Sequence, residues 1–583
     1  MPNKVVSPGK VKKESGEHAL TSAVHAVAQP RATRVVDVFV RLLEGLGVTH
    51  AFGCTGGTIA LFCEALAQSN VQVAQCRHES GAAFAAAEAF FATGHVTVVF
   101  TTSGPSILNA LNGLMAARTE GAKVILVSGS TPPRQRGRGA FQETSTRTLP
   151  RSVFTKGSIF DYAIDLVDPE DLDEAARALE EGLAGKSGFV AHVALPSSVQ
   201  GHPFEPRAAV AGSHSRTTLR GEDAAALAAT LRSEPFGIWV GFGAREDADL
   251  VRAFAERAGA PVIASPRGRG IMPENHPLFV GVTGLASPSD CGHAVAARRL
   301  KRMVVLGSRL GEFTSLWDER LVPEGGIVQV DVDAEVPRAF PQRPRLLIRA
   351  EIRDFLTAML EHWGSPVAAA PHLASTFGET PPASCRPGPV RPQLLMATLQ
   401  RVVVEAGARL LVDCGNCFAW ANTHLRFNAP RYRVSLGWGS MGQATAGVIG
   451  AAMTSTDRCV ALVGDGAMLM QNELSTAVKY GVPAVWVVLN DAQYGMIEQG
   501  MRAGHLEPVE TQIPRVDFVA LAESVGARGI SVREEREVDA ALRAAMSATG
   551  PFVVDVHISR DELAPIRSRV AALETQGVGK IDE

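Results

Sequence analysis

The sequence predicts an α/β protein built from three doubly wound parallel-sheet domains. Short apolar strands alternate with helical segments along most of its 583 residues, the pattern of parallel sheets covered by helices on both faces. One strand–helix–strand unit, at 459–489, requires two parallel neighbouring strands. A Pro- and Ala-rich stretch has the composition of an exposed connector. The expected segments are a flexible extension at 1–31, domains at 32–205, 221–363 and 390–559, a linker at 364–389 and a peripheral tail at 560–583.

Composition excludes several classes of protein. A hydrophobic content of 46% with 20% charged residues is typical of a globular protein with large cores. The net charge of −3 gives no electrostatic basis for binding nucleic acid or an anionic membrane. No apolar run is long enough for a membrane helix, and the N-terminus lacks the apolar core of a signal peptide. Eight scattered cysteines fit a reducing cytosol, so we expect a cytoplasmic protein.

The first domain opens with an amphipathic helix, because the apolar residues between Val35 and Leu46 form one stripe. Strands are expected to end at Gly53, Thr101 and Val127. An alanine-rich helix begins near Glu79. A carboxylate at a helix start is stabilised by the helix dipole, so Glu79 taken alone needs no catalytic explanation.

The middle domain shows strands that run into polar loops, at 238–244, 304–309 and 327–333. The first of them enters a glycine turn, Gly-Phe-Gly. A single GxG is weak support for a nucleotide site.

The third domain places two carboxylates at strand ends. A strand at 459–463 runs into a Gly-Asp-Gly turn, a helical pattern with Leu469 and Leu474 on one face follows, and a second strand ends near Asp491. Asp465 and Asp491 therefore lie at the carboxyl ends of neighbouring strands, where open α/β sheets bind ligands. Oxygen ligands beside a glycine turn and a helix N-terminus suit a Mg²⁺ that carries a phosphate group. An ordinary strand–helix–strand unit with acidic turns is the alternative when the motif is taken alone.

Cys414 and Cys417 form a CxxC pair in this domain. Because no second pair exists to complete a zinc site, two thiols at a strand end are the favoured interpretation.

Several motifs together resemble the thiamine-diphosphate (ThDP) dependent 2-oxo-acid enzymes, acetolactate synthase in particular. The family's GDG is followed some two dozen residues later by NN, and this chain has GDG followed by ND. The family's RHE-x-GAA, TSGPG-x-x-N and DAFQE correspond to segments at 77–83, 102–109 and 139–143. The resemblance runs from about residue 32 to 559. It implies a pyrimidine-binding domain, a central domain and a diphosphate-binding domain, in that order.

The resemblance also implies roles for individual residues. Glu79 would hydrogen-bond N1′ of the aminopyrimidine and favour the tautomer whose N4′ removes the C2 proton. The Gly439 carbonyl would accept from the 4′-amino group, and Met441 would hold the cofactor bent so that N4′ meets C2. The implied Mg²⁺ ligands are Asp465, Asp491 and the carbonyl of Gln493. The remaining implied cofactor contacts are Gly415, Asn416, Ser440, Gly464, Gly466, Ala467, Tyr494 and Gly495.

Further implications concern FAD and the assembly. The central domain binds a structural FAD in acetolactate synthase and nothing in many relatives, so both outcomes stay open here. The FAD candidates are Gly243, Arg309 and Asp331. In the family the active site lies between the first domain of one subunit and the third domain of another. A homodimer is therefore the expected minimum, and a homotetramer is common in relatives.

The expected reaction is decarboxylation of a pyruvate-like 2-oxo acid, after which the fragment left on the cofactor is added to a second carbonyl. Phe141 and Gln142 match the acetolactate synthase loop near the reacting centre, and Lys156 falls where that enzyme has a lysine. The loop at 103–109 lacks the histidines of simple decarboxylases. Gly500 stands where acetolactate synthase has a tryptophan, which favours a larger acceptor or donor and a role in specialised metabolism. A decarboxylase, an acyl-transferring relative and a non-catalytic scaffold remain alternatives.

Overall fold

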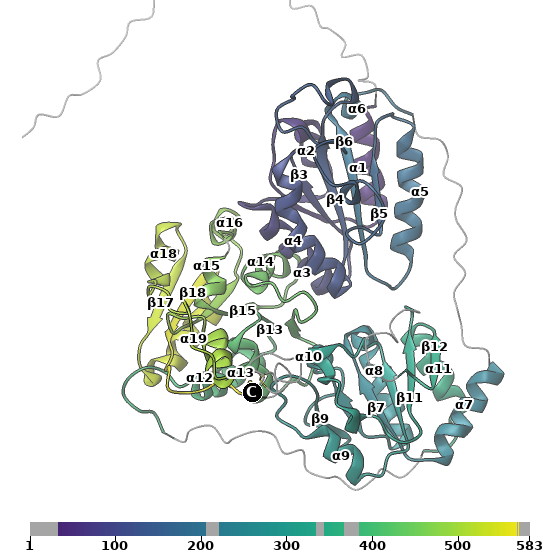
Figure 1. Cartoon of the computed structure of the whole chain (residues 1–583), viewed down its shortest axis with the longest axis vertical. Helices are drawn as coiled ribbons and strands as arrows, with labels where there is room; N and C mark the ends of the chain where they lie inside the picture. The colour runs from purple at the N-terminus through teal and green to yellow at the C-terminus, as the bar shows by residue number, and fades with distance from the viewer. Residues whose placement is uncertain are drawn as a thin grey trace, which may run out of the picture.

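The computed structural model describes residues 33–205, 221–333, 343–366, 384–470, 472–567 and 570. These residues form three α/β domains, each with a six-stranded sheet whose strand pairs are all parallel. Figure 1 shows the three domains as separate lobes around a common junction. The fold class expected from the sequence is confirmed. The expected extension at 1–31, most of the linker and most of the tail lie outside the described residues.

The first domain has the strand order β2-β1-β3-β4-β6-β5. Its strands are β1 (His50–Gly53), β2 (Gln72–Gln75), β3 (Thr97–Thr101), β4 (Lys123–Ser130), β5 (Tyr162–Asp165) and β6 (Phe189–Pro196). Its helices are α1 (Val35–Gly45), α2 (Ala60–Ala67), α3 (Glu79–Thr93), α4 (Pro105–Glu120), α5 (Asp171–Ala184) and α6 (Ser197–Gln200). The strands β3, β4 and β6 are buried almost throughout, because helices pack on both faces of the sheet.

The central domain has the order β12-β11-β10-β7-β8-β9. Its strands are β7 (Phe236–Val240), β8 (Val262–Ala264), β9 (Phe279–Val282), β10 (Arg302–Leu306), β11 (Ile327–Asp331) and β12 (Leu346–Arg349). Its helices are α7 (Gly221–Ser233), α8 (Ala248–Ala258), α9 (Cys291–Ala297), α10 (Glu312–Ser315) and α11 (Ile352–His362).

The third domain has the order β14-β13-β15-β16-β18-β17. Numbered from the first strand of each domain, this is the same order as in the first domain, so the two share one topology. Its strands are β13 (Arg409–Val412), β14 (Tyr432–Val434), β15 (Cys459–Gly464), β16 (Val485–Asn490), β17 (Arg528–Val532) and β18 (Phe552–His557). Its helices are α12 (Pro392–Leu399), α13 (Asn416–His424), α14 (Gln443–Thr454), α15 (Asp465–Leu469), α16 (Leu474–Tyr480), α17 (Gly495–Ala503), α18 (Phe518–Ser524) and α19 (Val538–Ser547).

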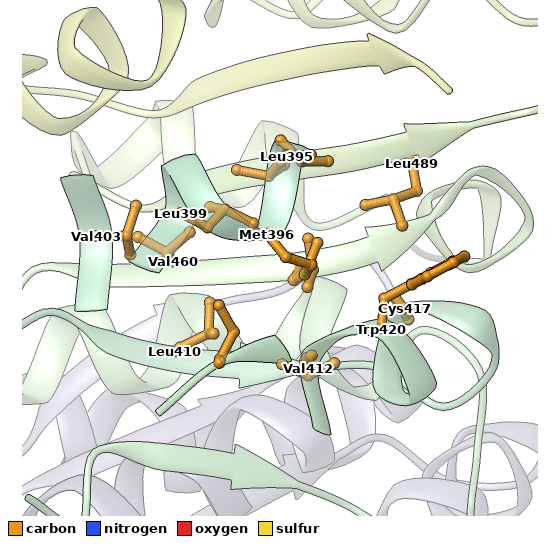
Figure 2. Close-up of a cluster of buried hydrophobic side chains, with 14 of the residues drawn as sticks. Leu395, Met396, Leu399, Val403, Leu410, Val412, Cys417, Trp420, Val460 and Leu489 are labelled. Carbon is orange, nitrogen blue, oxygen red and sulfur yellow. The ribbon is translucent and has the colours of Figure 1, made fainter. Parts of the chain in front are cut away.

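One of the two large hydrophobic clusters of the third domain lies between its sheet and α12. Figure 2 shows Leu395, Met396 and Leu399 of α12 over side chains of β13, β15 and β16, with Trp420 of α13 beside them. A π-helical turn at Gln400–Val404 continues α12, so the helical winding changes at that point.

One local expectation is wrong. The helical pattern after the Gly-Asp-Gly turn placed Leu469 and Leu474 on one face of a single helix. The structure instead has two short helices, α15 and α16, and Leu469 is exposed while Leu474 is buried. Because α15 ends at Leu469 and α16 begins only at Leu474, one helical periodicity does not run through both residues.

The first and third domains pack through α3 and α14, which lie beside each other in Figure 1. Small residues permit this approach: a Cβ built on Gly450 would lie 1.9 Å from the Ala85 carbonyl oxygen. A buried ion pair also connects the two domains. The guanidinium of Arg433, on β14, donates to both carboxylate oxygens of Glu88, on α3, at 2.9 and 2.7 Å.

Among the described residues, none of the helices is long and apolar enough to cross a membrane.

Candidate active site

The carboxyl ends of β15 and β16 bring Asp465 and Asp491 together. The two strands pair in parallel, with Gly464 opposite Leu489. Asp465 begins α15 and is 3% exposed. Its Oδ1 accepts from the Gly466 amide at 2.7 Å, and its Oδ2 accepts from the Ala492 amide at 2.6 Å. The carboxylate therefore connects the glycine turn to the loop after β16.

Burial and mutual repulsion disfavour the negative charges of Asp465 and Asp491. Burial and the neighbouring Asp465 raise the pKa of Asp491 to about 6. Burial also raises the pKa of Asp465. Asp491 Oδ2 accepts one hydrogen bond, from the Gln493 side-chain amide at 3.0 Å. Two converging carboxylates with raised pKa values provide the hard oxygen ligands that a divalent cation prefers.

Asn416 and Gly495 lie against this pair. A Cβ built on Gly495 would be 3.0 Å from both Asn416 Nδ2 and Asp491 Oδ2, so glycine is what allows the approach. Asn416 Oδ1 is buried and has no hydrogen-bond partner among the described residues. Because the oxygen and nitrogen of a carboxamide exchange by a flip, Asn416 can present either a donor or an acceptor to a ligand. Gly415, with φ of +104°, precedes α13 and turns the chain into it.

The loop that carries Gln493 is strained and externally held. Ala492 has φ of +54°, a left-handed conformation that is unfavourable for a residue with a Cβ. Arg560, which follows β18, donates to the carbonyl of Asp491 at 2.5 Å and to that of Ala492 at 3.0 Å. Backbone strain maintained by its surroundings is common at functional sites. Arg560 falls in the expected tail, and no sequence signal marked it.

The turn before α14 contributes the remaining third-domain residues of the candidate site. Gly439 and Gly442 have φ of +71° and +85°. The Cys414 thiol donates to the Gly439 carbonyl at 3.1 Å, and Asp413 Oδ2 accepts from the Gly442 amide at 2.9 Å. Burial raises the pKa of Asp413 to about 7.

The Met441 side chain extends from this turn to the carboxyl end of β15. A Cβ built on Gly466 would be 3.3 Å from the Met441 terminal methyl and 2.7 Å from the Tyr494 ring. The Ala467 carbonyl accepts from Thr445 of α14 at 3.2 Å. The structure therefore brings together nearly all the expected residues of the third domain.

Helix α4 of the first domain supports the same turn. Asn112 Oδ1 accepts from Trp438 Nε1 at 2.8 Å and from the Ser440 hydroxyl at 2.7 Å. Glu120 Oε1 accepts from the Gly437 amide at 3.0 Å. No sequence pattern marks Asn112 and Glu120, because a contact between residues some three hundred positions apart leaves no local pattern.

Glu79 begins α3, as expected, and is 8% exposed. Its Oε2 accepts from Asn109 Nδ2 at 3.0 Å. Asn109 lies one turn before Asn112 on α4, so one helix contacts both Glu79 and the turn that carries Gly439. This places the first-domain carboxylate and the third-domain turn against the same helix.

The loop with Phe141 and Gln142 has two unusual features. Phe141 is 89% exposed, which is rare for a phenylalanine. Gln142 has φ of +50° and packs on Gly104, where an added Cβ would be 2.8 Å from the Gln142 Cβ. Thr144 links the two segments that meet here. Its hydroxyl accepts from the Gly104 amide at 2.5 Å and donates to the Gln142 carbonyl at 3.1 Å. Lys156 is exposed.

The FAD candidates have packing roles. A Cβ built on Gly243 would be 2.9 Å from Gly307 Cα, so the glycine turn after β7 closes directly on the turn after β10. Arg309 donates to the Thr119 carbonyl of α4. Burial raises the pKa of Asp331, which accepts from the Asp333 amide at 3.0 Å. These contacts explain the residues without a flavin, and FAD binding stays a prediction.

The CxxC thiols are also accounted for by contacts within the turn. Cys417 donates to the Asp413 carbonyl at 3.0 Å, as Cys414 does to Gly439. Burial raises the pKa of both thiols, and the Asp413 charge adds to this. Both are therefore poor thiolates and act as hydrogen-bond donors.

Comparisons with known proteins agree with this geometry. The model of the N-terminal TPP binding domain of thiamine pyrophosphate enzymes matches residues 33–149, that of the central domain 224–359, and that of the C-terminal TPP binding domain 413–556. Together the three models span well over half of the chain.

Individual relatives align over nearly the full length. The "Putative thiamine pyrophosphate-containing protein YdaP" of Bacillus subtilis (strain 168) is 28% identical over 573 residues, 93% of this chain and 94% of that protein. The acetolactate synthase large subunit of Parasynechococcus marenigrum (strain WH8102) is 28% identical over 578 residues, 93% of this chain and 91% of that protein. An X-ray structure of "a putative thiamin diphosphate-dependent enzyme isolated from Mycobacterium smegmatis" has the same fold, with a TM-score of 0.77, 22% identity, and coverage of 90% of this chain and 99% of the other.

The three domain models match consecutive parts of the chain, and the first and third domains carry the site residues described above. This chain therefore belongs to the thiamine pyrophosphate enzyme family and resembles its acetolactate synthase large subunits.

Proposed function

We propose that this protein is a ThDP- and Mg²⁺-dependent carboligase. It would decarboxylate a pyruvate-like 2-oxo acid and join the remaining fragment to a second carbonyl compound. The observation that carries the proposal is the convergence of Asp465, Asp491, Asn416 and Met441 at one sheet edge. When bound, ThDP supplies the carbon nucleophile and the electron sink for decarboxylation.

The third domain would hold the diphosphate and the metal. Asp465, Asp491 and the carbonyl of Gln493 provide three oxygen ligands from the protein, and phosphate oxygens would add to them. Asn416, with its unpartnered buried oxygen, and the N-terminus of α15 would face the phosphate groups. Arg560 keeps the loop in the shape that directs Gln493 toward them.

The aminopyrimidine would lie between the third domain of one copy and the first domain of a second copy. The Gly439 carbonyl, already oriented by Cys414, would accept from the 4′-amino group. Met441 would support the bend of the cofactor. Glu79 would share a proton with N1′, and its low exposure strengthens such a hydrogen bond, because water competes less.

Two observations support addition to a second carbonyl over release of an aldehyde. The segment 103–109, which includes the first turn of α4, carries no histidine to deliver a proton. A Cβ built on Gly500 meets no atom within 4 Å, and the neighbouring Ile497 is 58% exposed. The space beside α17 would accommodate a larger acceptor than a tryptophan at this position would allow.

A second copy of the chain would complete the site. Large apolar side chains are exposed on both domains that would form the site: Phe141 on the first domain, and Leu469, Met470 and Ile497 on the third. Exposed apolar groups around a polar site are typical of interaction surfaces. We therefore propose a homodimer or homotetramer.

The test is a reaction of the protein with Mg²⁺, ThDP and pyruvate, alone or with larger 2-oxo acids or aldehydes, with products identified by mass spectrometry. Ligated products that are lost in Glu79→Gln support the proposal, and a preference for a larger partner supports specialised metabolism. Strict use of two pyruvates would make it an ordinary acetolactate synthase. Aldehyde or acyl phosphate as product would favour the other reaction classes. Failure to bind Mg-ThDP would favour a scaffold.

A further inference from the structure

Glu473 is a buried carboxylate that the proposed function does not use. It lies in the third domain immediately before α16, is 1% exposed, and points into the interface with the first domain. Its Oε1 accepts from the amides of Arg77 and His78, at 3.0 and 2.9 Å. Its Oε2 accepts from the Thr476 hydroxyl at 2.5 Å and from the Arg77 amide at 3.2 Å. A buried carboxylate needs such partners, but their identity is informative.

The two amides belong to the residues directly before Glu79. His78 is the N-cap of α3, and its ring Nδ1 accepts from the Ser80 amide at 3.2 Å. Fixing the amides of Arg77 and His78 fixes the backbone from which α3 starts. Because Glu79 is the first residue of α3, that backbone sets where its carboxylate begins and in which direction it extends.

Neighbouring contacts hold the same segment from the same side. Arg77 Nε donates to the Ser475 hydroxyl at 2.9 Å, and the Gln75 amide donates to the Tyr480 hydroxyl at 2.8 Å. Of these partners Glu473 alone is fully buried, and its carboxylate receives both amides next to Glu79. It is therefore the contact through which a change in the third domain would most directly move Glu79.

We propose that Glu473 is a positioning residue for Glu79. From the diphosphate-binding domain, it fixes the turn that aims the carboxylate of Glu79 at its target. This inference rests on the proposed role of Glu79 toward the aminopyrimidine. Only the short helix α15 and a break separate Asp465 from Glu473. The segment that begins at the proposed metal-binding turn therefore ends in contact with the N-terminus of α3, where Glu79 lies.

Three substitutions separate reach from charge. Glu473→Ala removes both acceptors. Glu473→Gln keeps the length and one acceptor oxygen for the amides, and its NH₂ group can donate to Thr476. Glu473→Asp keeps the charge but is one methylene too short to reach both amides. A positioning role predicts that Gln preserves function better than Asp, whereas an electrostatic role predicts the reverse.

The measured quantity is the rate of hydrogen–deuterium exchange at C2 of ThDP bound to the full-length protein with Mg²⁺, read by NMR after acid quench. It reports the action of Glu79 without requiring a known substrate. We expect Glu473→Ala to slow this exchange by about 10- to 100-fold, as displacements near 1 Å do in active sites. Glu473→Gln should stay within about threefold of wild type, and Glu473→Asp should resemble Ala.

Two further readouts identify a merely structural effect. Amide exchange of the peptide spanning 76–81 in the cofactor-free protein should accelerate in Glu473→Ala. Tyr480→Phe, which removes the hydrogen-bond partner of the Gln75 amide at the last residue of α16, should leave C2 exchange unchanged. The inference is overturned if Glu473→Ala exchanges C2 at the wild-type rate, or if Asp outperforms Gln. If the wild-type protein itself does not accelerate C2 exchange over free ThDP, the proposed function fails instead.

Discussion

Replacement of Arg560 by methionine tests how the structure holds its metal-binding loop. Arg560 donates to the carbonyls of Asp491 and Ala492, at 2.5 and 3.0 Å. Methionine keeps much of the aliphatic stem and removes both donors. Ala492, with its φ of +54°, would then lose the contact that maintains its unfavourable conformation.

The size of the effect follows from the two hydrogen bonds. Hydrogen bonds from a charged donor contribute about 1.5–3 kcal/mol each when buried. Arg560 is exposed, and the freed carbonyls can bind water, so we take about 1.5–3 kcal/mol for the pair together. Since about 1.4 kcal/mol corresponds to a tenfold change in affinity, Mg²⁺ should bind about 10- to 100-fold more weakly in the presence of ThDP.

The assay is calorimetric titration of Mg²⁺ into wild-type and Arg560→Met protein, both saturated with ThDP. Arg560→Lys is the matched control: it keeps the charge but lacks the two-pronged geometry, so its affinity should fall between the two. If Arg560→Met binds Mg²⁺ within a factor of about two of wild type, the loop keeps its shape unaided and the reasoning is refuted.

Three other substitutions test separate parts of the structure. Gly104→Ala should lower the free energy of unfolding by about 1–3 kcal/mol and reduce kcat, because its φ is +67° and its Cβ would press on Gln142; unchanged denaturation and kcat would contradict this. Glu88→Gln should destabilise the protein by about 3–5 kcal/mol in urea unfolding, since Arg433 would keep a buried charge without its carboxylate; a loss below about 1 kcal/mol would show that the pair is dispensable. The raised pKa of Asp413, about 7, makes the folded state bind a proton that the unfolded chain has released. Its contribution to stability is complete below about pH 4 and is lost as the pH rises to about 7. Between pH 5.5 and 8 wild type should therefore lose about 2 kcal/mol that Asp413→Asn does not lose, and parallel pH profiles would refute the assignment.

The sequence was most informative where glycine and acidic residues mark strand ends. The Gly-Asp-Gly turn and Asp491 were located from local patterns, because such turns need a particular residue type at a particular place. Gly439 and Met441 were identified through the family resemblance. The parallel sheets followed from the alternation of strands and helices, which leaves few topologies open.

Other features depend on contacts that no local pattern records. Arg560 holds a loop almost seventy residues earlier in the chain, Glu473 holds a turn nearly four hundred residues earlier, and Asn112 holds a turn more than three hundred residues later. Leu469 was misplaced because helical periodicity does not reveal a break between two short helices. Magnesium, FAD, the assembly and the cytoplasmic location stay predictions.

The most direct measurement is the fate of pyruvate carrying a labelled carboxyl carbon, incubated with the wild-type protein, Mg²⁺, ThDP and a panel of aldehydes and 2-oxo acids. We expect labelled CO₂ to be released together with a ligated ketone, and Glu79→Gln to lose both while still binding ThDP. Release of CO₂ with free acetaldehyde as the sole other product would contradict carboligation. Wild-type activity in Glu79→Gln would contradict the central role assigned to Glu79.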